Sequence, residues 1–262
     1  MSRCLVTGHK GYIGSKVFAE LKKQGHDVLG IDLKEEIPKN ILHYLKEDYE
    51  GQFHPYFSSF KPEYIFHLAC IPRVAYSVEK PIETMENNVL ATSYVLNFAR
   101  KNNVKRVIYS GSSSVVGNGN GPVSPYGLQK LISEQECKLY SELYGLDTVT
   151  LRYFNVYSPC QKVEGPYATA VANWMHSIRT GKNPYITGNG RQRRDMAYLD
   201  DIVSANLFAM NHSKNFNGQH YDVGTGENIS LNEIKEIVLH HHPDVKFDYV
   251  DERVGDVLCT KA

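Results

Sequence analysis

The sequence predicts an α/β protein built on a doubly wound parallel sheet, with a smaller lid in its C-terminal part. Two observations support this fold class. Short apolar segments alternate with segments of helical periodicity through the first half of the chain, which is typical of a parallel sheet covered by helices on both faces. From about residue 156 this alternation loosens, and glycine and proline cluster between shorter helical segments.

The elements follow from the period of the apolar residues. Strands are expected near residues 3–7, 27–32, 41–46, 63–69, 104–110 and 147–153. Helices are expected near residues 12–24, 50–60, 81–101, 126–145, 167–180, 199–212 and 230–241. With right-handed crossovers between parallel strands, ligands would bind outside the carboxyl ends of the sheet.

The first strand runs into a turn with three glycines, Gly8, Gly11 and Gly14, and a helix follows. Such a turn lets the backbone approach a pyrophosphate, which then lies against the free N–H groups of the helix. Asp32 ends the second strand at the distance where a carboxylate can accept hydrogen bonds from a ribose 2′-hydroxyl. Because that carboxylate would repel a 2′-phosphate, the sequence favours NAD over NADP; a solvated strand end is the alternative for Asp32.

Bulk composition excludes several classes of protein. The 29 basic and 29 acidic residues balance, which argues against a nucleic-acid or membrane surface as the main partner. No apolar segment precedes Arg3, so neither a signal peptide nor a membrane span is expected.

The five cysteines are scattered and indicate reduced thiols in a cytoplasm. His240, His241 and His242 would point in different directions along a helix, so no metal site is expected.

A candidate catalytic group follows the strand near 104–110. The strand ends in a serine cluster, Ser110 to Ser114, and the next helix carries Tyr126 and Lys130 on one face. An unperturbed tyrosine has a pKa of about 10 and is a poor base at neutral pH. The ammonium group and a nicotinamide ring would favour the phenolate, and a serine hydroxyl could hold the substrate alcohol. The alternative is a surface tyrosine beside a solvated lysine.

Taken together, these motifs resemble the extended short-chain dehydrogenase/reductases, and within them the NAD-dependent nucleotide-sugar epimerase/dehydratase family. The resemblance covers the whole chain. Further matching segments are His67–Ala69, Asn88, Leu151–Pro159, Gly188–Asp195, Val223–Gly226 and Arg253–Asp256. It implies a Rossmann domain over residues 1–155, with segments near 196–225 returning to it, and a mainly substrate-binding part over 156–262.

The resemblance also implies roles for individual residues. Tyr126 would be the base, Ser112 its hydroxyl partner, and Lys130 the group that activates the tyrosine and holds the cofactor ribose. The expected cofactor-binding residues are Gly8, Gly11, Tyr12, Ile13, Gly14, Asp32, Asp48, Leu68, Ala69, Asn88, Ser110, Tyr126, Lys130, Tyr153 and Asn155. The expected substrate-binding residues are Arg73, Ser112, Ser113, Asn155, Arg194 and Arg253. An arginine fork suits a diphosphate, although Arg194 lies in a basic run that could be plain surface charge.

Within the family, the sequence favours a 4-epimerase of a UDP-hexose or UDP-N-acetylhexosamine that keeps NAD tightly bound. Dehydratases of the family carry an Asp-Glu pair after the catalytic hydroxyl residue, where this chain has Ser113 and Ser114. The segment 71–81 resembles the substrate loop of UDP-sugar 4-epimerases. The alternatives are a decarboxylase, a GDP-sugar epimerase or reductase, and a catalytically silent NAD-binding regulatory or scaffold protein. The product is expected to serve as a precursor for polysaccharide synthesis.

Several positions depart from the family pattern. The loop 118–123 is short, Val116 replaces a common tyrosine, Ser158 replaces a glycine, and Cys160 replaces an arginine. The chain ends at Ala262, where relatives continue, so the substrate side could be shortened. A homodimer is expected through the helices near 81–101 and 126–145. Apolar residues on these helices would serve either a partner or the sheet: Val89, Val95, Leu96, Leu131, Leu139 and Leu143.

Overall fold

The computed structural model describes residues 1–32, 59–159, 161, 163, 169–252 and 257–262. Its centre is a six-stranded sheet in which every neighbouring pair is parallel. Across the sheet the order is β10 (His220–Val223), β5 (Thr148–Tyr153), β4 (Arg106–Ser112), β3 (Tyr64–His67), β1 (Arg3–Thr7) and β2 (Asp27–Ile31). The predicted parallel sheet is confirmed.

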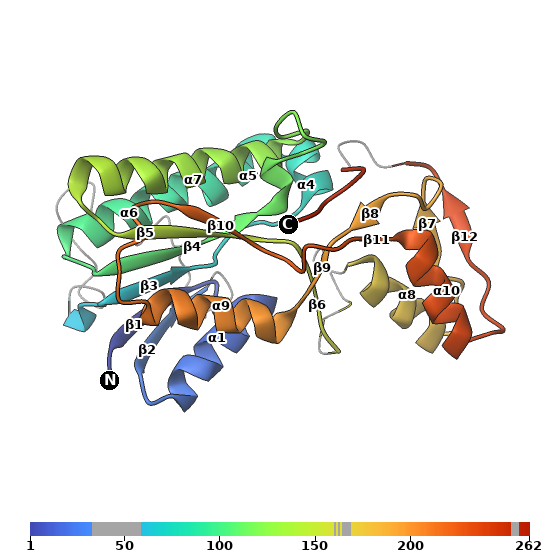
Figure 1. The fold of residues 1–262 in the computed structure, drawn as a ribbon, viewed down its shortest axis with the longest axis horizontal. Helices are drawn as coiled ribbons and strands as arrows, with labels where there is room; N and C mark the ends of the chain where they lie inside the picture. The colour runs from blue at the N-terminus through green and yellow to red at the C-terminus, as the bar shows by residue number, and fades with distance from the viewer. Residues whose placement is uncertain (33–58, 160, 162, 164–168, 253–256) are drawn as a thin grey trace.

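Helices cover both faces of this sheet, as Figure 1 shows. On one face lie α6 (Ala91–Lys101) and α7 (Pro125–Tyr144), and on the other lie α1 (Tyr12–Lys23) and α9 (Leu199–Asn211). Successive strand residues point to opposite faces. Ile65 of β3 therefore packs in the core beneath α6 and α7, whereas Phe66 packs in the core beneath α1 and α9. The fold is doubly wound, as predicted.

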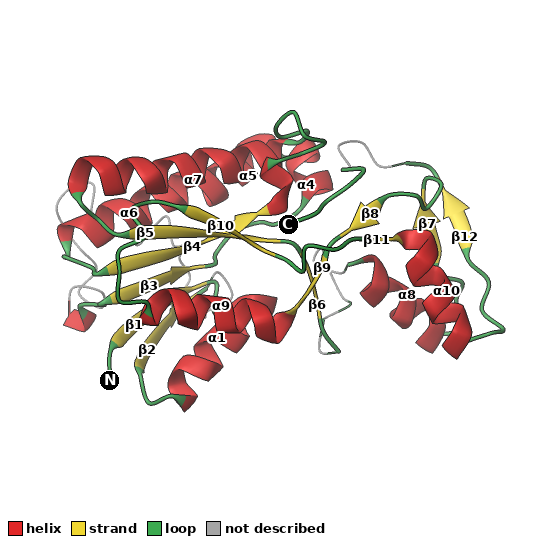
Figure 2. Ribbon diagram, in the orientation of Figure 1, coloured by secondary structure: helices red, strands yellow, loops and turns green. Residues whose placement is uncertain are grey.

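A smaller group of elements lies at one end of the molecule, away from the N-terminus (Figure 2). Its helices are α8 (Ala170–Arg179) and α10 (Leu231–His241). Its short strands form two pairs: β7 (Tyr185–Thr187) with β12 (Asp248–Val250), and β8 (Arg193–Arg194) with β11 (Ile229–Ser230). A third pair, β6 (Asn155–Tyr157) with β9 (Met196–Tyr198), lies between this group and the central sheet. Trp174 and Ile186 are fully buried between these elements. We call this group the lid.

The boundaries differ from prediction where local periodicity is a weak guide. The predicted helix 81–101 consists of α5 (Pro81–Met85), a π-helical turn (Glu86–Leu90) and α6. The helix α4 (Val74–Glu79) was not predicted, and β4 extends to Ser112 rather than ending at residue 110. The lid strands have two or three residues each, too few for an alternating pattern to be recognised. The predicted strand 41–46, and the predicted helix 50–60 except its last two residues, lie outside the described residues.

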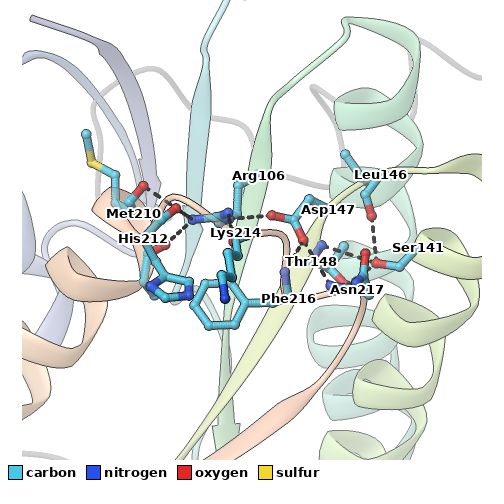
Figure 3. Close-up of polar contacts among 11 residues, drawn as sticks. Arg106, Ser141, Leu146, Asp147, Thr148, Met210, His212, Lys214, Phe216 and Asn217 are labelled. Atoms are coloured by element: carbon cyan, nitrogen blue, oxygen red, sulfur yellow. Dashed lines mark hydrogen bonds and ion pairs between the residues drawn. The ribbon is translucent and has the colours of Figure 1, made fainter.

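A buried ion pair joins α9 and the following segment to the amino ends of β4 and β5 (Figure 3). Arg106 donates to the carboxylate of Asp147, and both side chains are almost completely buried. Asp147 also accepts from the backbone N–H groups of Phe216 and Asn217, at 2.8 and 3.1 Å. The guanidinium donates in addition to main-chain carbonyls at the end of α9 and beyond it, those of Ala209, His212 and Lys214. This network fixes the return of the chain from α9 to β10.

Two further properties of the described residues concern membrane-spanning helices and disulfide bonds. Within these residues no helix has both the length and the apolar character that a bilayer crossing requires. The four cysteines that they include, Cys4, Cys70, Cys137 and Cys259, are free thiols. Cys160 lies outside the described residues.

Candidate functional site

The glycine-rich turn after β1 is packed so closely that two of its glycines accept no larger side chain. Gly8 has φ +74°, and a Cβ atom there would lie 2.8 Å from the backbone nitrogen of Ala69. A Cβ atom on Gly14 would lie 2.1 Å from the oxygen of Gly8. Gly11 is the N-cap of α1 and offers no capping side chain, so the first N–H groups of the helix open onto the turn. This arrangement suits an anionic ligand.

The acid at the end of β2 lies beside the same turn. Oδ2 of Asp32 accepts a hydrogen bond of 2.9 Å from the backbone N–H of Lys10. Tyr12, at the start of α1, donates from its hydroxyl to Oγ of Ser158 at 2.7 Å. Ser158 therefore links the turn to the segment after β6, which gives a function to the departure from glycine. Ile13 packs in the core beneath α1, and Asp48 lies outside the described residues.

The loop after β3 lies against the glycine-rich turn, and Asn88 holds it. Leu68 and Ala69 lie against Gly8. The side chain of Asn88 accepts from the N–H of Ile71 at 2.7 Å and donates to the Ile71 carbonyl at 3.2 Å and to Gln129 at 2.8 Å. Asn88 lies in the π-helical turn, a feature common at functional sites.

Tyr126 and Lys130 lie one turn apart on α7, and their side chains are 9% and 2% exposed. Nζ of Lys130 donates to the carbonyl of Ser110 at 2.6 Å and lies 4.8 Å from the centre of the Tyr109 ring. Burial raises the pKa of Tyr126 to about 12, while the Lys130 charge and a hydrogen bond with Ser112 lower it. Burial therefore keeps the phenol protonated at neutral pH despite the Lys130 charge, and an added positive charge would favour its ionisation.

Three contacts fix the first turn of α7. Ser124 is the N-cap, and its hydroxyl accepts from the N–H of Gly127 at 3.1 Å. The N–H of Tyr126 donates to Oγ of Ser77 on α4 at 3.0 Å. A Cβ atom on Gly127 would lie 2.7 Å from the oxygen of Ser114, so only glycine permits this approach to the serine cluster. The catalytic candidates on α7 and at the end of β4 are thereby brought together.

Within the serine cluster, Ser112 is at the end of β4 and its hydroxyl lies 2.8 Å from that of Ser114. Ser113 begins a 3-10 turn and is half-buried. The short loop that follows is closed by a bridge between Gly117 and Gly121. Asn118 at its tip accepts from the N–H of Leu258 at 2.8 Å, so the loop contacts the C-terminal segment.

The lid contains a cavity of about 190 Å³, and Asn155 and Arg194 both line it. Trp174 also lines it and donates from its indole nitrogen to the Tyr185 carbonyl at 2.6 Å. The other lining residues are Thr169, Ala170, Val171, Asn173, Tyr185, Thr187, Met196, Leu231 and Ile234. Thr169 is the N-cap of α8, so this helix presents its N-terminus to the cavity.

Asn155 and Tyr153 have different surroundings. The side chain of Asn155 donates to the main-chain oxygen of Asp195 at 2.9 Å and to the hydroxyl of Thr260 at 3.1 Å. The hydroxyl of Tyr153 instead pairs with Asn206 of α9. Burial raises the pKa of Tyr153, so this side chain is a neutral part of the core.

The structure places the expected site residues in different parts of the molecule. Asn155 and Arg194 line the lid cavity, Tyr153 lies in the core, and Ser112, Tyr126 and Lys130 lie at the end of β4 and the start of α7. Arg73 is the N-cap of α4, and Arg253 lies outside the described residues. The sequence analysis missed the lid residues Thr169, Trp174 and Tyr185. Only the cap position of Thr169 before an apolar helix gave a signal for them.

Known proteins resemble this chain in sequence and in fold. The profile of the NAD dependent epimerase/dehydratase family matches residues 4–224. A UDP-glucose 4-epimerase of Mycolicibacterium smegmatis is 32% identical, over 88% of this chain and 80% of that protein. A UDP-N-acetyl-alpha-D-glucosaminuronate decarboxylase of Bacillus cytotoxicus is 31% identical, over 89% and 78%. The crystal structure of UDP-glucose 4-epimerase from Thermotoga maritima with UDP-glucose has a TM-score of 0.89 and 30% identity, over 99% and 89%.

Proposed function

The chain belongs to the NAD-dependent epimerase/dehydratase family, and from this premise we propose that it is an NAD-dependent 4-epimerase of a UDP-hexose or UDP-N-acetylhexosamine. The observation that carries the proposal is the placement of Tyr126 beside Lys130 and Ser112, at the carboxyl edge of the parallel sheet. The reaction inverts one carbinol centre of the sugar through a transient 4-keto sugar.

The residues around the glycine-rich turn fit NAD, and we call the proposed NAD site between this turn and Tyr126 the cofactor crevice. Gly8 has a positive φ and a Cβ atom on Gly14 would clash with the Gly8 oxygen, so the turn carries no side chain at these positions. Such a turn suits a pyrophosphate at the start of α1. Asp32 lies beside that turn and would accept from the adenosine ribose hydroxyls. When bound, NAD supplies a hydride acceptor that returns the hydride to the sugar.

The chain itself handles the proton. The phenolate of Tyr126 would remove the proton of the sugar 4-hydroxyl, and Ser112 would donate a hydrogen bond to the same oxygen. Lys130 stabilises the phenolate because it lies one turn away and is shielded from water. In the return half of the reaction, Tyr126 gives the proton back to the new hydroxyl. No further acid or base is required.

The lid cavity suits the nucleotide part of the substrate. Arg194 offers a fork of donors for phosphate oxygens, and Asn155 offers an amide beside it. The N-terminus of α8 contributes positive charge at the same cavity. We infer that residues 156–262 mainly bind the nucleotide sugar and that residues 1–155 bind the cofactor.

Two observations bear on which reaction of the family the protein catalyses. Ser113 and Ser114 follow Ser112, and neither hydroxyl can supply the acid and base that water loss needs. The relative that decarboxylates a UDP-sugar keeps decarboxylation as the second candidate. A substrate with a carboxyl group at C5 separates these two reactions.

A homodimer is proposed through the segment 81–101 and α7. Leu139 and Leu143 of α7 are 49% and 67% exposed, and Ile82 of α5 is 72% exposed, so these side chains offer apolar area that a partner would cover. Val95 and Leu96 are buried in the core against the sheet and do not belong to this surface. Light scattering at micromolar concentration should give a dimer, and a Leu143→Glu variant should shift it to monomer. A monomeric wild type would refute the proposal.

We propose that the protein is cytoplasmic. The free thiols of the described cysteines are consistent with a reducing compartment. Fractionation of cells that express the tagged protein tests this assignment, and recovery in a secreted fraction would refute it.

The function is tested by incubating the purified protein with UDP-glucose, UDP-N-acetylglucosamine or UDP-glucuronate and recording proton spectra by NMR. Appearance of the 4-epimer without added NAD supports the proposal. Loss of carbon dioxide from UDP-glucuronate would instead assign a decarboxylase. Bound NAD without conversion of any of these sugars would favour a regulatory NAD-binding protein.

A further inference from the structure

His67 is a buried histidine that the proposed chemistry does not use. It ends β3, next to β1 and beneath α6, and is 1% exposed. Each ring nitrogen lies against a threonine hydroxyl. Nδ1 is 2.7 Å from Oγ1 of Thr7, and Nε2 is 3.0 Å from Oγ1 of Thr92.

The neighbouring bonds determine which nitrogen carries the proton. The hydroxyl of Thr92 donates its only proton to the carbonyl of Asn88 at 2.7 Å. Its oxygen must therefore accept from His67, which places the ring proton on Nε2. On the other side, the oxygen of Thr7 accepts from the N–H of Ala69 at 3.2 Å, so its own proton is available to Nδ1.

The hydrogen bonds of this series all run in one direction. They lead from the N–H of Ala69 through Thr7, His67 and Thr92 to the carbonyl of Asn88. We propose that His67, held as the Nε2–H tautomer, is a positioning residue that fixes the two sides of the cofactor crevice relative to each other. We call the series of hydrogen bonds from Ala69 to Asn88 the His67 relay. This inference rests on the proposed function, because it assigns the crevice to NAD.

The ends of the His67 relay are the parts of the crevice where small displacements matter most. The nitrogen of Ala69 lies 2.8 Å from where a Cβ atom of Gly8 would be, so Ala69 closes the glycine-rich turn. Asn88 holds both backbone polar groups of Ile71. A change in the spacing of Ala69 and Asn88 would therefore move the loop between them against the turn.

The main chain of His67 is also connected to α7, through Ser110. The hydroxyl of Ser110 donates to the carbonyl of His67 at 3.0 Å. The carbonyl of Ser110 in turn accepts from Lys130. His67 thus connects the cofactor turn, the loop held by Asn88 and the lysine beside the proposed base.

The electrostatic surroundings keep this ring uncharged. Burial, followed by the nearby charge of Lys130, lowers the pKa of His67 to about 3. A doubly protonated ring would donate from Nδ1 to Thr7, whose oxygen already accepts from Ala69, and the Thr7 proton would lose its acceptor. The geometry and the charges therefore select the same neutral tautomer.

The first test observes the tautomer directly in the wild-type protein. Long-range proton–nitrogen NMR correlation at neutral pH, assigned by comparison with a His67→Gln variant, should show one neutral histidine protonated at Nε2 and unprotonated at Nδ1. A ring protonated at Nδ1, or an imidazolium, would overturn the proposal without any bearing on epimerase activity.

The second test uses a matched pair at Thr92. Thr92→Val preserves the shape but removes the hydroxyl, whereas Thr92→Ser preserves the hydroxyl. We expect Thr92→Val to weaken NAD binding about tenfold, because the buried Nε2–H of His67 loses its acceptor and the His67 relay no longer reaches Asn88. Thr92→Ser should remain within about twofold of the wild type. NAD affinity is measured on protein stripped of cofactor, by calorimetric titration.

A measurement of UDP binding to the lid distinguishes a positioning role of the His67 relay from general damage to the fold. Trp174 is the only tryptophan of the chain and lines the lid cavity, so its fluorescence reports UDP binding there. Thr92→Val should leave UDP affinity unchanged while NAD affinity falls. Equal NAD affinity of the Val and Ser variants would refute the positioning role, and an equal loss of UDP and NAD binding would refute it as well. Failure of the wild type to convert UDP-sugars would refute the proposed function and leave these binding results intact.

Discussion

The ammonium group of Lys130 lies 2.6 Å from the main-chain oxygen of Ser110 and is almost completely shielded from water. A buried charge needs compensating partners, and the carbonyl of Ser110 and the face of the Tyr109 ring supply them. Both partners belong to β4, at the carboxyl edge of the sheet. The positive charge is therefore held by the sheet, one helical turn from Tyr126.

This placement predicts how activity depends on pH. In the proposed mechanism Tyr126 acts as a phenolate, and the Lys130 charge lowers the pKa of Tyr126 against the larger effect of burial. Replacing Lys130 by Met should raise that pKa further, so that the rise of kcat/KM with pH moves to higher pH. Lys130→Arg keeps the charge and should move the profile less. A Met variant whose profile coincides with that of the wild type would contradict the assignment.

The role of the phenol itself is tested by Tyr126→Phe. The change removes one hydroxyl from a side chain that is 9% exposed, so the packing is retained. Conversion of a UDP-sugar should fall by a factor of about 100 or more, as expected when a general base is lost. The amount of NAD that copurifies should stay close to that of the wild type. Wild-type rates in the Phe variant would exclude Tyr126 as the base.

The parts of the molecule that could be predicted from sequence are those in which distant contacts add little information. The β1–turn–α1 unit and the pair Tyr126–Lys130 depend on spacing within a single continuous segment. The sequence analysis recovered both for this reason. Their environment required the fold, since Ser77, which holds the N–H of Tyr126, comes from a six-residue helix without a clear periodicity.

The lid could be predicted only in outline. Asn155 and Arg194 were identified from resemblance alone, and the cavity that they share is assembled from strands of two or three residues. The apolar spacing of the segment 81–101 predicted one continuous helix and did not reveal the π-helical turn that contains Asn88. Long-range contacts between short segments therefore decide the remainder of the site.

Asp195 illustrates such a contact and leads to a third prediction. Its carboxylate is completely buried and accepts from the N–H and hydroxyl of Thr225, both at 2.8 Å, and from the N–H groups of Gly226 and Ala262. Asp195→Asn would turn an amide NH₂ group toward these donors. We expect a loss of about 1–3 kcal/mol in the free energy of unfolding.

The same variant should affect the substrate more than the cofactor. Asp195 follows Arg194 directly, and its main-chain oxygen accepts from Asn155, so its displacement would disturb the lid cavity. KM for the UDP-sugar should rise while NAD affinity stays near the wild-type value. Asp200→Asn, at an exposed position in the first turn of α9, is the matched control and should change neither. An unchanged KM in Asp195→Asn would show that the carboxylate only stabilises the fold.

The buried pair of Arg106 and Asp147 leads to a prediction about stability (Figure 3). Arg106→Met leaves the carboxylate of Asp147 buried without its cation, and carbonyls around the end of α9 lose their donor. The free energy of unfolding should fall by about 3–5 kcal/mol. The double variant Arg106→Met with Asp147→Asn should be destabilised by less than the sum of the two single variants. Urea unfolding gives all four values, and strict additivity would contradict a direct coupling of the two charges.

The last prediction concerns unfolding in acid. The pKa of His67 falls from 6.5 to about 3 on folding because the ring is buried. Below pH 6.5 the unfolded chain therefore binds a proton that the folded chain does not, and this difference lowers stability as the pH falls toward 3. The effect approaches about 1.4 kcal/mol per pH unit at its steepest.

A His67→Gln variant cannot take up this proton, so its free energy of unfolding should change less between pH 6.5 and pH 5 than that of the wild type. The comparison concerns slopes, because the variant also loses hydrogen bonds of the His67 relay at every pH. Carboxylates with lowered pKa values, such as Glu63 and Glu233, also lose stabilising charge in acid, but they do so equally in both proteins. Identical slopes would mean that His67 titrates in the folded protein much as it does in the unfolded chain, which its complete burial between two threonine hydroxyls does not allow.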